Sequence, residues 1–166
     1  MEFAAGKAKS CLSSYPDALI LGSDTLIHLG AEVLGKPVDL ADAEVMLRRL
    51  AGHKHRIVTA VALAGPDPDR CDVRLAEVLV TMKPLNEAAL GDYLRTGESL
   101  GKAGAYSIQG GGAAFIERIE GDFTAAVGLP LRLVVEMLQQ RGLSCPVDIE
   151  QLYAGRPYPN WDRFRA

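Results

Sequence analysis

The sequence has few cysteines, and they are scattered along the chain. Cys11, Cys71 and Cys145 are odd in number and far apart, and no two of them form a CxxC pair. Neither a disulfide framework nor a zinc knuckle is therefore indicated. Unpaired cysteines of this kind fit a reducing compartment, so the expected location is the cytoplasm.

Positive charge is not concentrated anywhere in the chain. The formal net charge is −3, and no block of lysine or arginine occurs. Duplex nucleic acid and anionic membranes both need a concentrated positive field, so neither is expected as a partner. An anionic small molecule stays open as a ligand, because a few basic side chains in one pocket suffice to bind it.

Long apolar runs are also absent. The segment after Met1 lacks the apolar core of a signal peptide, and no run reaches the length that spans a bilayer. The chain has 166 residues, of which 48% are hydrophobic and 23% charged, as in an ordinary globular protein of one domain.

Patterns typical of strands and helices alternate along the chain. Expected strands span residues 18–22, 26–34 (as a hairpin), 56–64, 73–82 and 113–120. Expected helices span residues 2–13, 39–50, 86–95 and 130–141, with Asp39 and Asn86 as N-caps of the second and third. This order predicts a single α/β domain with a mixed, twisted sheet flanked by helices. The tail from residue 144 onward, with its prolines and aromatics, fits an extended strap or a loose segment equally well.

Asp24 is the first candidate for chemistry. It follows the apolar run Ala18-Leu19-Ile20-Leu21, which is typical of a strand covered on both faces, and we expect it where that strand ends. Polar residues at strand ends often line ligand crevices in α/β sheets, and carboxylates bind magnesium. The alternative is an aspartate that caps a turn. A phosphotransferase with a nucleophilic aspartate is disfavoured, because Leu26 stands where a second Asp is typical.

Two further segments offer charge and hydrogen bonds. Lys36 lies between Gly35 and Pro37, so a rigid turn holds its side chain outside regular structure; it is either a phosphate-binding group or a solvated turn lysine. The glycine-rich stretch of residues 101–112 lets the backbone approach a ligand, and Lys102 and Gln109 supply an ammonium group and an amide.

Other polar residues favour ordinary structural roles. His53 and His55 lie in a polar turn without a third ligand nearby, so we expect surface histidines and not a metal pair. The serines at positions 10, 13 and 14 lack a Gly-x-Ser-x-Gly setting, so a serine hydrolase is not indicated.

The order of these motifs resembles the Maf (septum formation inhibitor) family of nucleoside triphosphate pyrophosphatases over residues 4–142. The motifs are Gly22-Ser23-Asp24-Thr25, Gly35-Lys36-Pro37, Thr59-Ala60-Val61, the stretch of residues 101–110, and Val127-Gly128-Leu129-Pro130-Leu131. The resemblance implies a Maf/ITPase-like fold. It also implies hydrolysis of a nucleoside triphosphate to its monophosphate and pyrophosphate with a divalent cation, Mg²⁺ or Mn²⁺.

The resemblance also implies roles for individual residues. Asp24 matches the catalytic aspartate, which serves as metal ligand and as base for the attacking water, and Lys36 matches the lysine that stabilises phosphate charge. Thr25 and Gln109 match positions tied to base choice, and Lys102 and Glu98 match further polar positions of the cleft. The segment Tyr106-Ser107-Ile108-Gln109-Gly110 is similar to that of the branch acting on dTTP and UTP.

The chain departs from the family pattern at both ends. The strand, Ser-x-Ser-Pro-Arg-Arg loop and helix with which members begin have no counterpart before residue 4, so we expect the first strand–loop–helix unit to be missing. The expected division is a Maf-like domain over residues 1–142 and a tail of unknown role over 143–166. Many members are dimers, so the resemblance points to a homodimer. The competing hypothesis is a shortened homologue with little or no catalysis that binds nucleotides or a protein partner.

Overall fold

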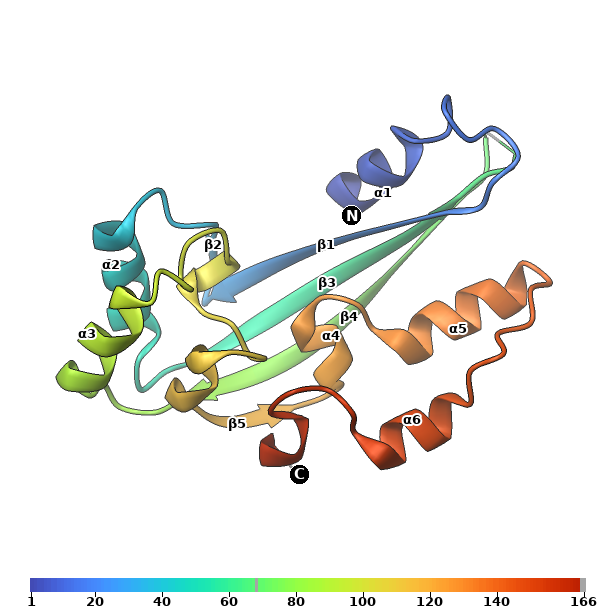
Figure 1. Cartoon of the computed structure of the whole chain (residues 1–166). Coiled ribbons are helices and arrows are strands. Elements are labelled where there is room, and N and C mark those ends of the chain that lie inside the picture. Colours follow the sequence, from blue (N-terminus) through green and yellow to red (C-terminus); the bar gives the residue numbers. More distant parts are fainter. Residues whose placement is uncertain (68, 165–166) are drawn as a thin grey trace.

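The computed structural model describes residues 1–67 and 69–164, and its centre is a five-stranded sheet in the order β2-β1-β3-β4-β5 (Figure 1). The strands are β1 (Ile20–Leu29), β2 (Glu32–Leu34), β3 (Lys54–Ala64), β4 (Cys71–Met82) and β5 (Ile116–Glu120). The α-helices are α1 (Glu2–Lys9), α2 (Leu40–Leu50), α3 (Glu87–Arg95), α4 (Phe123–Val127), α5 (Leu131–Gln140) and α6 (Ile149–Gly155). Three short 3₁₀ turns are η1 (Ala103–Ala105), η2 (Gly111–Phe115) and η3 (Trp161–Phe164).

The expected α/β class, with a sheet flanked by helices, is confirmed, but the sheet is not mixed. Each of the pairs β1–β2, β1–β3, β3–β4 and β4–β5 is antiparallel. A parallel pair requires a connection that crosses the sheet and returns the chain to its starting end. Here the connection through α3 returns the chain to the end at which β4 finishes, so β5 runs antiparallel to β4 (Figure 1). β2 and β3 run in the same direction, but β1 lies between them and is antiparallel to both.

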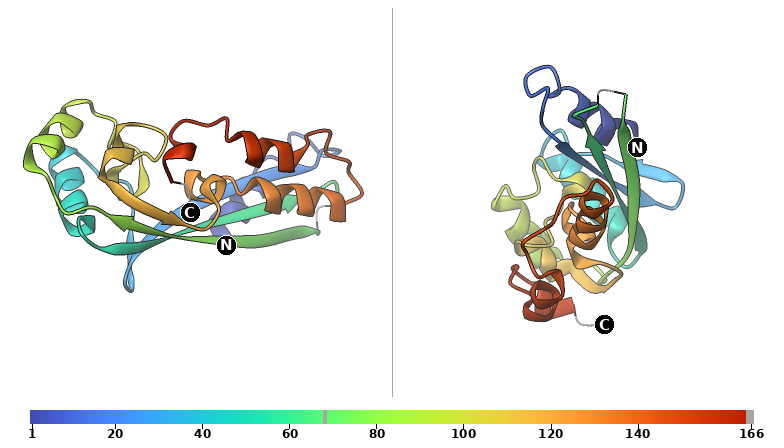
Figure 2. Two further views of the ribbon diagram at one scale, coloured as in Figure 1. Left: turned by 90° about the horizontal axis from the view of Figure 1, so that it is seen from below. Right: turned by 90° about the vertical axis from the view of Figure 1, so that its right-hand side faces the viewer.

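Helices cover both faces of the long strands (Figure 2). On one face, Ala4 and Ala8 of α1 pack against small residues of the sheet, including Ala60 and Ala62. On the other face, Val134 and Met137 of α5 pack against Val61 and Leu63, the alternate positions of β3. β3 is therefore buried on both sides, whereas β1, where we expected such burial, leaves Leu21 41% exposed.

The larger core cluster lies where α2 and α3 meet the sheet. Leu47 and Leu50 of α2 and Leu90 of α3 belong to the same buried cluster as Ile57 and Val80 of the strands. Both predicted N-caps are confirmed: the Asp39 side chain accepts from the Asp42 N–H at 2.8 Å, and that of Asn86 from the Ala89 N–H at 3.0 Å. None of the helices within the described part of the chain is long and apolar enough to cross a membrane.

The described part of the C-terminal tail, up to residue 164, packs on the domain. It forms α6, which lies alongside α5, and η3, whose Trp161 is 5% exposed (Figure 2). The Trp161 ring stacks on Phe123 of α4 with ring centroids 5.2 Å apart. The tail is thus neither a loose segment nor a fully extended strap. The division of the chain at residue 142 stays a prediction.

The contact between α1 and β1 depends on the absence of a side chain at Gly22. A Cβ there would meet the carbonyl oxygen of Ala4 and come within 2.8 Å of the Ala8 nitrogen. We expect Gly22→Ala to destabilise the protein by about 1–3 kcal/mol, because helix and strand must separate. The measurement is urea unfolding followed by circular dichroism.

Gly6→Ala is the matched control, because a Cβ at Gly6 of α1 meets nothing within 4 Å. It should be neutral or stabilising by up to about 1 kcal/mol, since alanine favours the helix. Equal unfolding free energies for the two variants would contradict the close approach at Gly22.

Candidate active site

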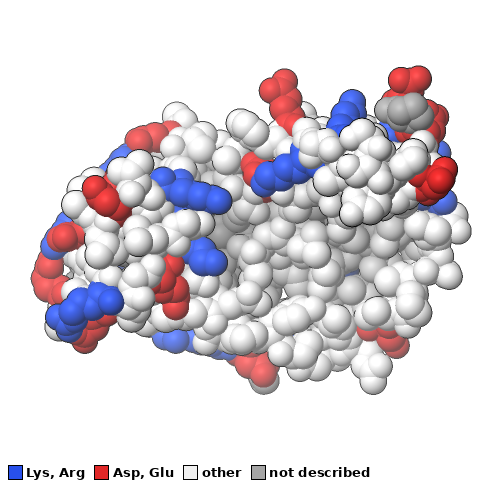
Figure 3. All heavy atoms as spheres, turned by 45° about the horizontal axis from the view of Figure 1, so that its top comes forward, with Lys and Arg blue, Asp and Glu red and all other residues white. Residues whose placement is uncertain are grey.

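A hollow with a volume of about 360 Å³ brings most of the predicted site residues together. Figure 3 shows it as a depression in the middle of the visible face, with lysine and arginine atoms at its margins. It is lined by residues from α1, β1, the Gly35-Lys36-Pro37 turn, the glycine-rich loop of residues 101–112 and the end of α4. Its size is at the lower end of the range of roughly 300–1,000 Å³ for small-molecule sites.

The hollow forms along an unpaired stretch of β1. In the described part of the chain, β2 pairs with Ile27, His28 and Leu29 only, so the earlier part of β1 is the edge of the sheet. Asp24 lies opposite Ala60 on the face covered by α1, and Thr25 lies opposite Thr59 on the other face. Both line the hollow because it extends around this edge. The expectation that Asp24 stands at a strand end is wrong: it lies within the ten-residue strand β1.

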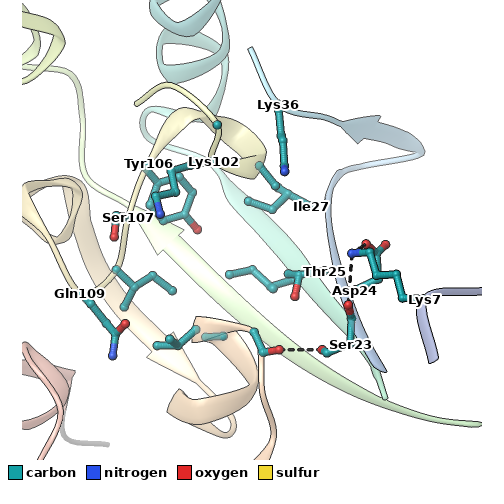
Figure 4. A pocket seen from close by; sticks show the side chains of 17 residues that line it. Lys7, Ser23, Asp24, Thr25, Ile27, Lys36, Lys102, Tyr106, Ser107 and Gln109 are labelled. Atoms are coloured by element: carbon teal, nitrogen blue, oxygen red, sulfur yellow. Dashed lines mark hydrogen bonds and ion pairs between the residues drawn. The ribbon is translucent and has the colours of Figure 1, made fainter. Parts of the chain in front are cut away.

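Asp24 forms an ion pair with Lys7 of α1. The Lys7 Nζ donates to Asp24 Oδ1 at 2.6 Å and to the Ser23 carbonyl oxygen at 3.2 Å, and Figure 4 shows the pair at one side of the hollow. Two acceptors on one strand fix where the ammonium group lies. The sequence did not single out Lys7, because it precedes Asp24 by 17 residues and no local spacing joins a helix to the following strand.

A short chain of hydrogen bonds, the Thr25–Thr59–Ala125 relay, links the Thr25 hydroxyl through the Thr59 hydroxyl to the Ala125 carbonyl oxygen. The Thr59 hydroxyl, which is fully buried, donates to the Ala125 carbonyl oxygen at 2.8 Å. A hydroxyl has one hydrogen, so the 2.9 Å contact between the two threonines must be a bond that Thr25 donates to Thr59. The Thr25 oxygen therefore presents only acceptor capacity to the hollow.

Lys36 and Lys102 supply positive charge from the other side. The Gly104 N–H donates to the Gly35 carbonyl oxygen at 2.9 Å, so the lysine turn and the glycine-rich loop are joined directly. In the view of Figure 4, Lys36 extends into the space between Lys102 and Asp24. Gln109 also lines the hollow, from the far part of the same loop.

Glu98 takes a different position from the other predicted residues. Its carboxylate accepts from the Gly111 N–H at 3.0 Å and the Gly112 N–H at 3.2 Å, and Glu98 is not among the described residues that line the hollow. Burial acts to raise the pKa of Glu98, but the two N–H bonds, Tyr93 and Lys102 together hold it below its usual value. A Cβ at Gly110 would overlap the Glu98 carboxyl group, so a larger residue there would displace this carboxylate. Through these hydrogen bonds, Glu98 stabilises the conformation of the loop that carries Gln109.

Tyr106, which lines the hollow, forms a hydrogen bond with a buried histidine. The Tyr106 hydroxyl and the His55 Nε2 are 2.7 Å apart, and both side chains are buried. Burial lowers the pKa of His55 to about 4. The expectation of two surface histidines is correct for His53 and wrong for His55, because the alternation of β3 turns His55 into the core.

The residues present fit a cation that arrives with a ligand. Among the residues that the structure describes, no three His, Cys, Asp or Glu side chains come together as a metal site, and Asp24 is the sole carboxylate of the lining. Mg²⁺ is often held by one or two carboxylates together with substrate phosphates. Asp24 can serve such a cation, whereas a site built from protein ligands alone is not present in the described part.

Comparison with known proteins agrees with the motifs. Residues 1–141 match the family model described as Maf-like protein. A dTTP/UTP pyrophosphatase of Symbiobacterium thermophilum is 46% identical over 139 residues, which are 84% of this chain and 71% of that protein. Proteins of the same name from Koribacter versatilis (39% over 140 residues, 84% of this chain and 72% of that protein) and Shewanella sp. strain MR-7 (46% over 143 residues, 84% and 73%) are also similar.

The buried His55 predicts a loss of stability in mild acid. Its pKa is about 4 in the folded chain and about 6.5 when unfolded, so between these values the unfolded state binds a proton that the folded state does not. The part of the unfolding free energy that depends on His55 should therefore fall by about 2 kcal/mol from about pH 7.5 to about pH 5. Urea unfolding at both pH values measures it.

His55→Gln should reduce this pH dependence by a similar amount, and His53→Gln, the exposed control, should leave it as in the wild type. An unchanged pH dependence in His55→Gln would contradict the assignment to His55.

Proposed function

We propose that this chain, which belongs to the Maf-like protein family, is a nucleoside triphosphate pyrophosphatase acting on dTTP and UTP. The observation that carries the proposal is the convergence of Asp24, Lys36, Lys102 and Gln109 on one hollow from three separate segments. Relatives 39–46% identical to the chain bear the name of this activity. The competing hypothesis of a non-catalytic binding module has no such support.

The charge of the hollow suits a triphosphate. Among the described residues, its lining holds three lysines, Lys7, Lys36 and Lys102, and a single carboxylate, that of Asp24. Ammonium groups act as positive point charges for phosphate oxygens, and they stabilise the negative charge that develops during phosphoryl transfer. We assign Lys36 and Lys102 to the phosphates, because Lys7 is already bonded to Asp24.

Asp24 is assigned the role of base. Its carboxylate would accept a proton from the water that attacks the phosphorus atom, with pyrophosphate as leaving group. Lys7 orients this carboxylate through the 2.6 Å bond to one oxygen and leaves the other oxygen for water. A divalent cation bound by the triphosphate and Asp24 would neutralise phosphate charge when present.

Base choice is assigned to Thr25 and Gln109. The Thr25 oxygen can only accept from a ligand, since its hydrogen is donated to Thr59. The Gln109 amide offers a donor and an acceptor, which matches the edge of a pyrimidine with its N3–H and carbonyl oxygens. Glu98 acts indirectly by holding the loop. Residues 1–142 form the catalytic unit in this proposal.

The test is the release of pyrophosphate from UTP and dTTP in the presence of Mg²⁺ or Mn²⁺. Asp24→Asn should lower kcat by roughly 100- to 10,000-fold, because the amide cannot take up the proton. Its carbonyl oxygen can still accept from Lys7, so folding should be preserved. Asp17→Asn, in an exposed turn, is the matched control and should retain the wild-type rate.

Two results would overturn the proposal in different ways. A wild-type chain that releases no pyrophosphate from any nucleoside triphosphate with either cation would refute the activity. Full activity in Asp24→Asn would refute the role of Asp24 and leave the activity in place.

A further inference from the structure

The C-terminal tail contacts the loop that carries Gln109. The Asn160 Nδ2 lies 2.9 Å from the Ile108 carbonyl oxygen and 3.2 Å from that of Gly110. These carbonyl groups belong to the residues on either side of Gln109. Carbonyl oxygens only accept, so the amide nitrogen of Asn160 must face them and donate one hydrogen to each.

The position of Asn160 is fixed by its aromatic neighbours. Trp161 stacks between Phe123 and Tyr158, with ring centroids 5.2 Å and 5.6 Å away and interplanar angles of 10° and 7°. The Tyr153 ring meets Trp161 edge-on at 5.0 Å. The backbone of Asn160 is left-handed, with φ of 66°, a conformation that asparagine tolerates better than most residues. The side-chain amide therefore projects from a rigid support.

The loop is held on its other side by different groups. The Glu98 carboxylate accepts from the N–H groups of Gly111 and Gly112, and the Ser107 N–H donates to the Tyr93 hydroxyl at 3.3 Å. These bonds hold the residues before and after the segment Ile108-Gln109-Gly110. The two bonds from Asn160 act on the segment itself, and a peptide whose carbonyls are held cannot rotate freely.

We propose that Asn160 is a positioning residue that sets the orientation of Gln109 and thereby the preference for a pyrimidine base. This inference rests on the proposed function, in which Gln109 reads the base. Asn160 itself is not among the described residues that line the hollow, so it acts through the loop. The tail, which lies outside the residues matched by the family model, would thus contribute to specificity.

Two substitutions at Asn160 distinguish the effect of its side-chain amide from the effect of its left-handed backbone. Asn160→Asp keeps the size of the side chain and replaces the donor with a carboxylate that faces two carbonyl oxygens. Asn160→Gly removes the side chain and still tolerates the left-handed backbone. Arg156→Gly, at a second left-handed position of the tail (φ of 44°), is the matched control.

The first measurement needs no activity. Hydrogen exchange of the amides of residues 107–113 should become faster in Asn160→Asp and Asn160→Gly and stay unchanged in Arg156→Gly. The second measurement is the affinity for UTP and for ATP in an Asp24→Asn background, where the expected loss of kcat slows turnover. The ratio of the two affinities should fall by about tenfold in both Asn160 variants, which is the scale expected for two lost neutral hydrogen bonds.

A coupling test distinguishes positioning from a general structural role. In a Gln109→Ala background, Asn160→Asp should leave the UTP-to-ATP ratio unchanged, because the group that Asn160 positions is gone. In the active chain, Asn160→Asp should raise KM for UTP with a smaller effect on kcat.

Unchanged exchange of residues 107–113, or an unchanged affinity ratio, would overturn the inference. The same fall in the ratio with and without Gln109 would also overturn it. An inactive wild-type chain would refute the proposed activity instead, while exchange and affinity still decide the role of Asn160.

Discussion

The unpaired part of β1 is the constraint on which the site depends. Because β2 pairs only with the last residues of β1, the strand reaches Asp24 and Thr25 with one side free. In a strand paired on both sides, successive side chains are separated by the sheet, and these two neighbours could not meet one ligand. At an edge they can, and the hollow takes its carboxylate from one face and its threonine from the other. An open edge is usually a liability for a sheet, and here it is occupied by the site.

The two sides of the hollow are built in different ways. On the β1 side, regular structure holds each group: the Lys7–Asp24 pair joins helix to strand, and the Thr25–Thr59–Ala125 relay joins strand to α4. On the loop side, the backbone is irregular, and side chains from elsewhere hold it through Glu98 and Asn160. Asp24, which is assigned to the phosphate chemistry, thus lies on a regular strand. Gln109, which is assigned to base reading, depends on side chains outside its own loop, those of Glu98 and Asn160.

Much of the fold could be predicted because its signals are local. The caps at Asp39 and Asn86 and the spacing of apolar residues in α2 and α5 are properties of a few neighbouring residues, and the structure has these helices. The antiparallel order of the sheet could not be predicted in this way, since it depends on which strands become neighbours in space. The burial of His55 could not be predicted for a similar reason. The polar residues around His55 fit a turn as well as the start of a strand, and only the register of β3 shows that His55 faces the core.

The lysines of the hollow could not be predicted as a group from the sequence either. Their position explains how a protein with a negative net charge can have a pocket lined mainly by positive charge. The net charge of −3 counts all residues equally, whereas a ligand in the hollow meets three lysines and one aspartate at close range. At physiological ionic strength, charges farther than about 8 Å are largely screened, so the near groups dominate the potential that a bound anion feels. A polyanion such as duplex DNA would instead extend over a surface on which both signs of charge occur, and it would gain little (Figure 3). The composition therefore separates large polyanions from small ones, but it cannot locate the pocket. Locating it requires the fold that brings Lys7, Lys36 and Lys102 together.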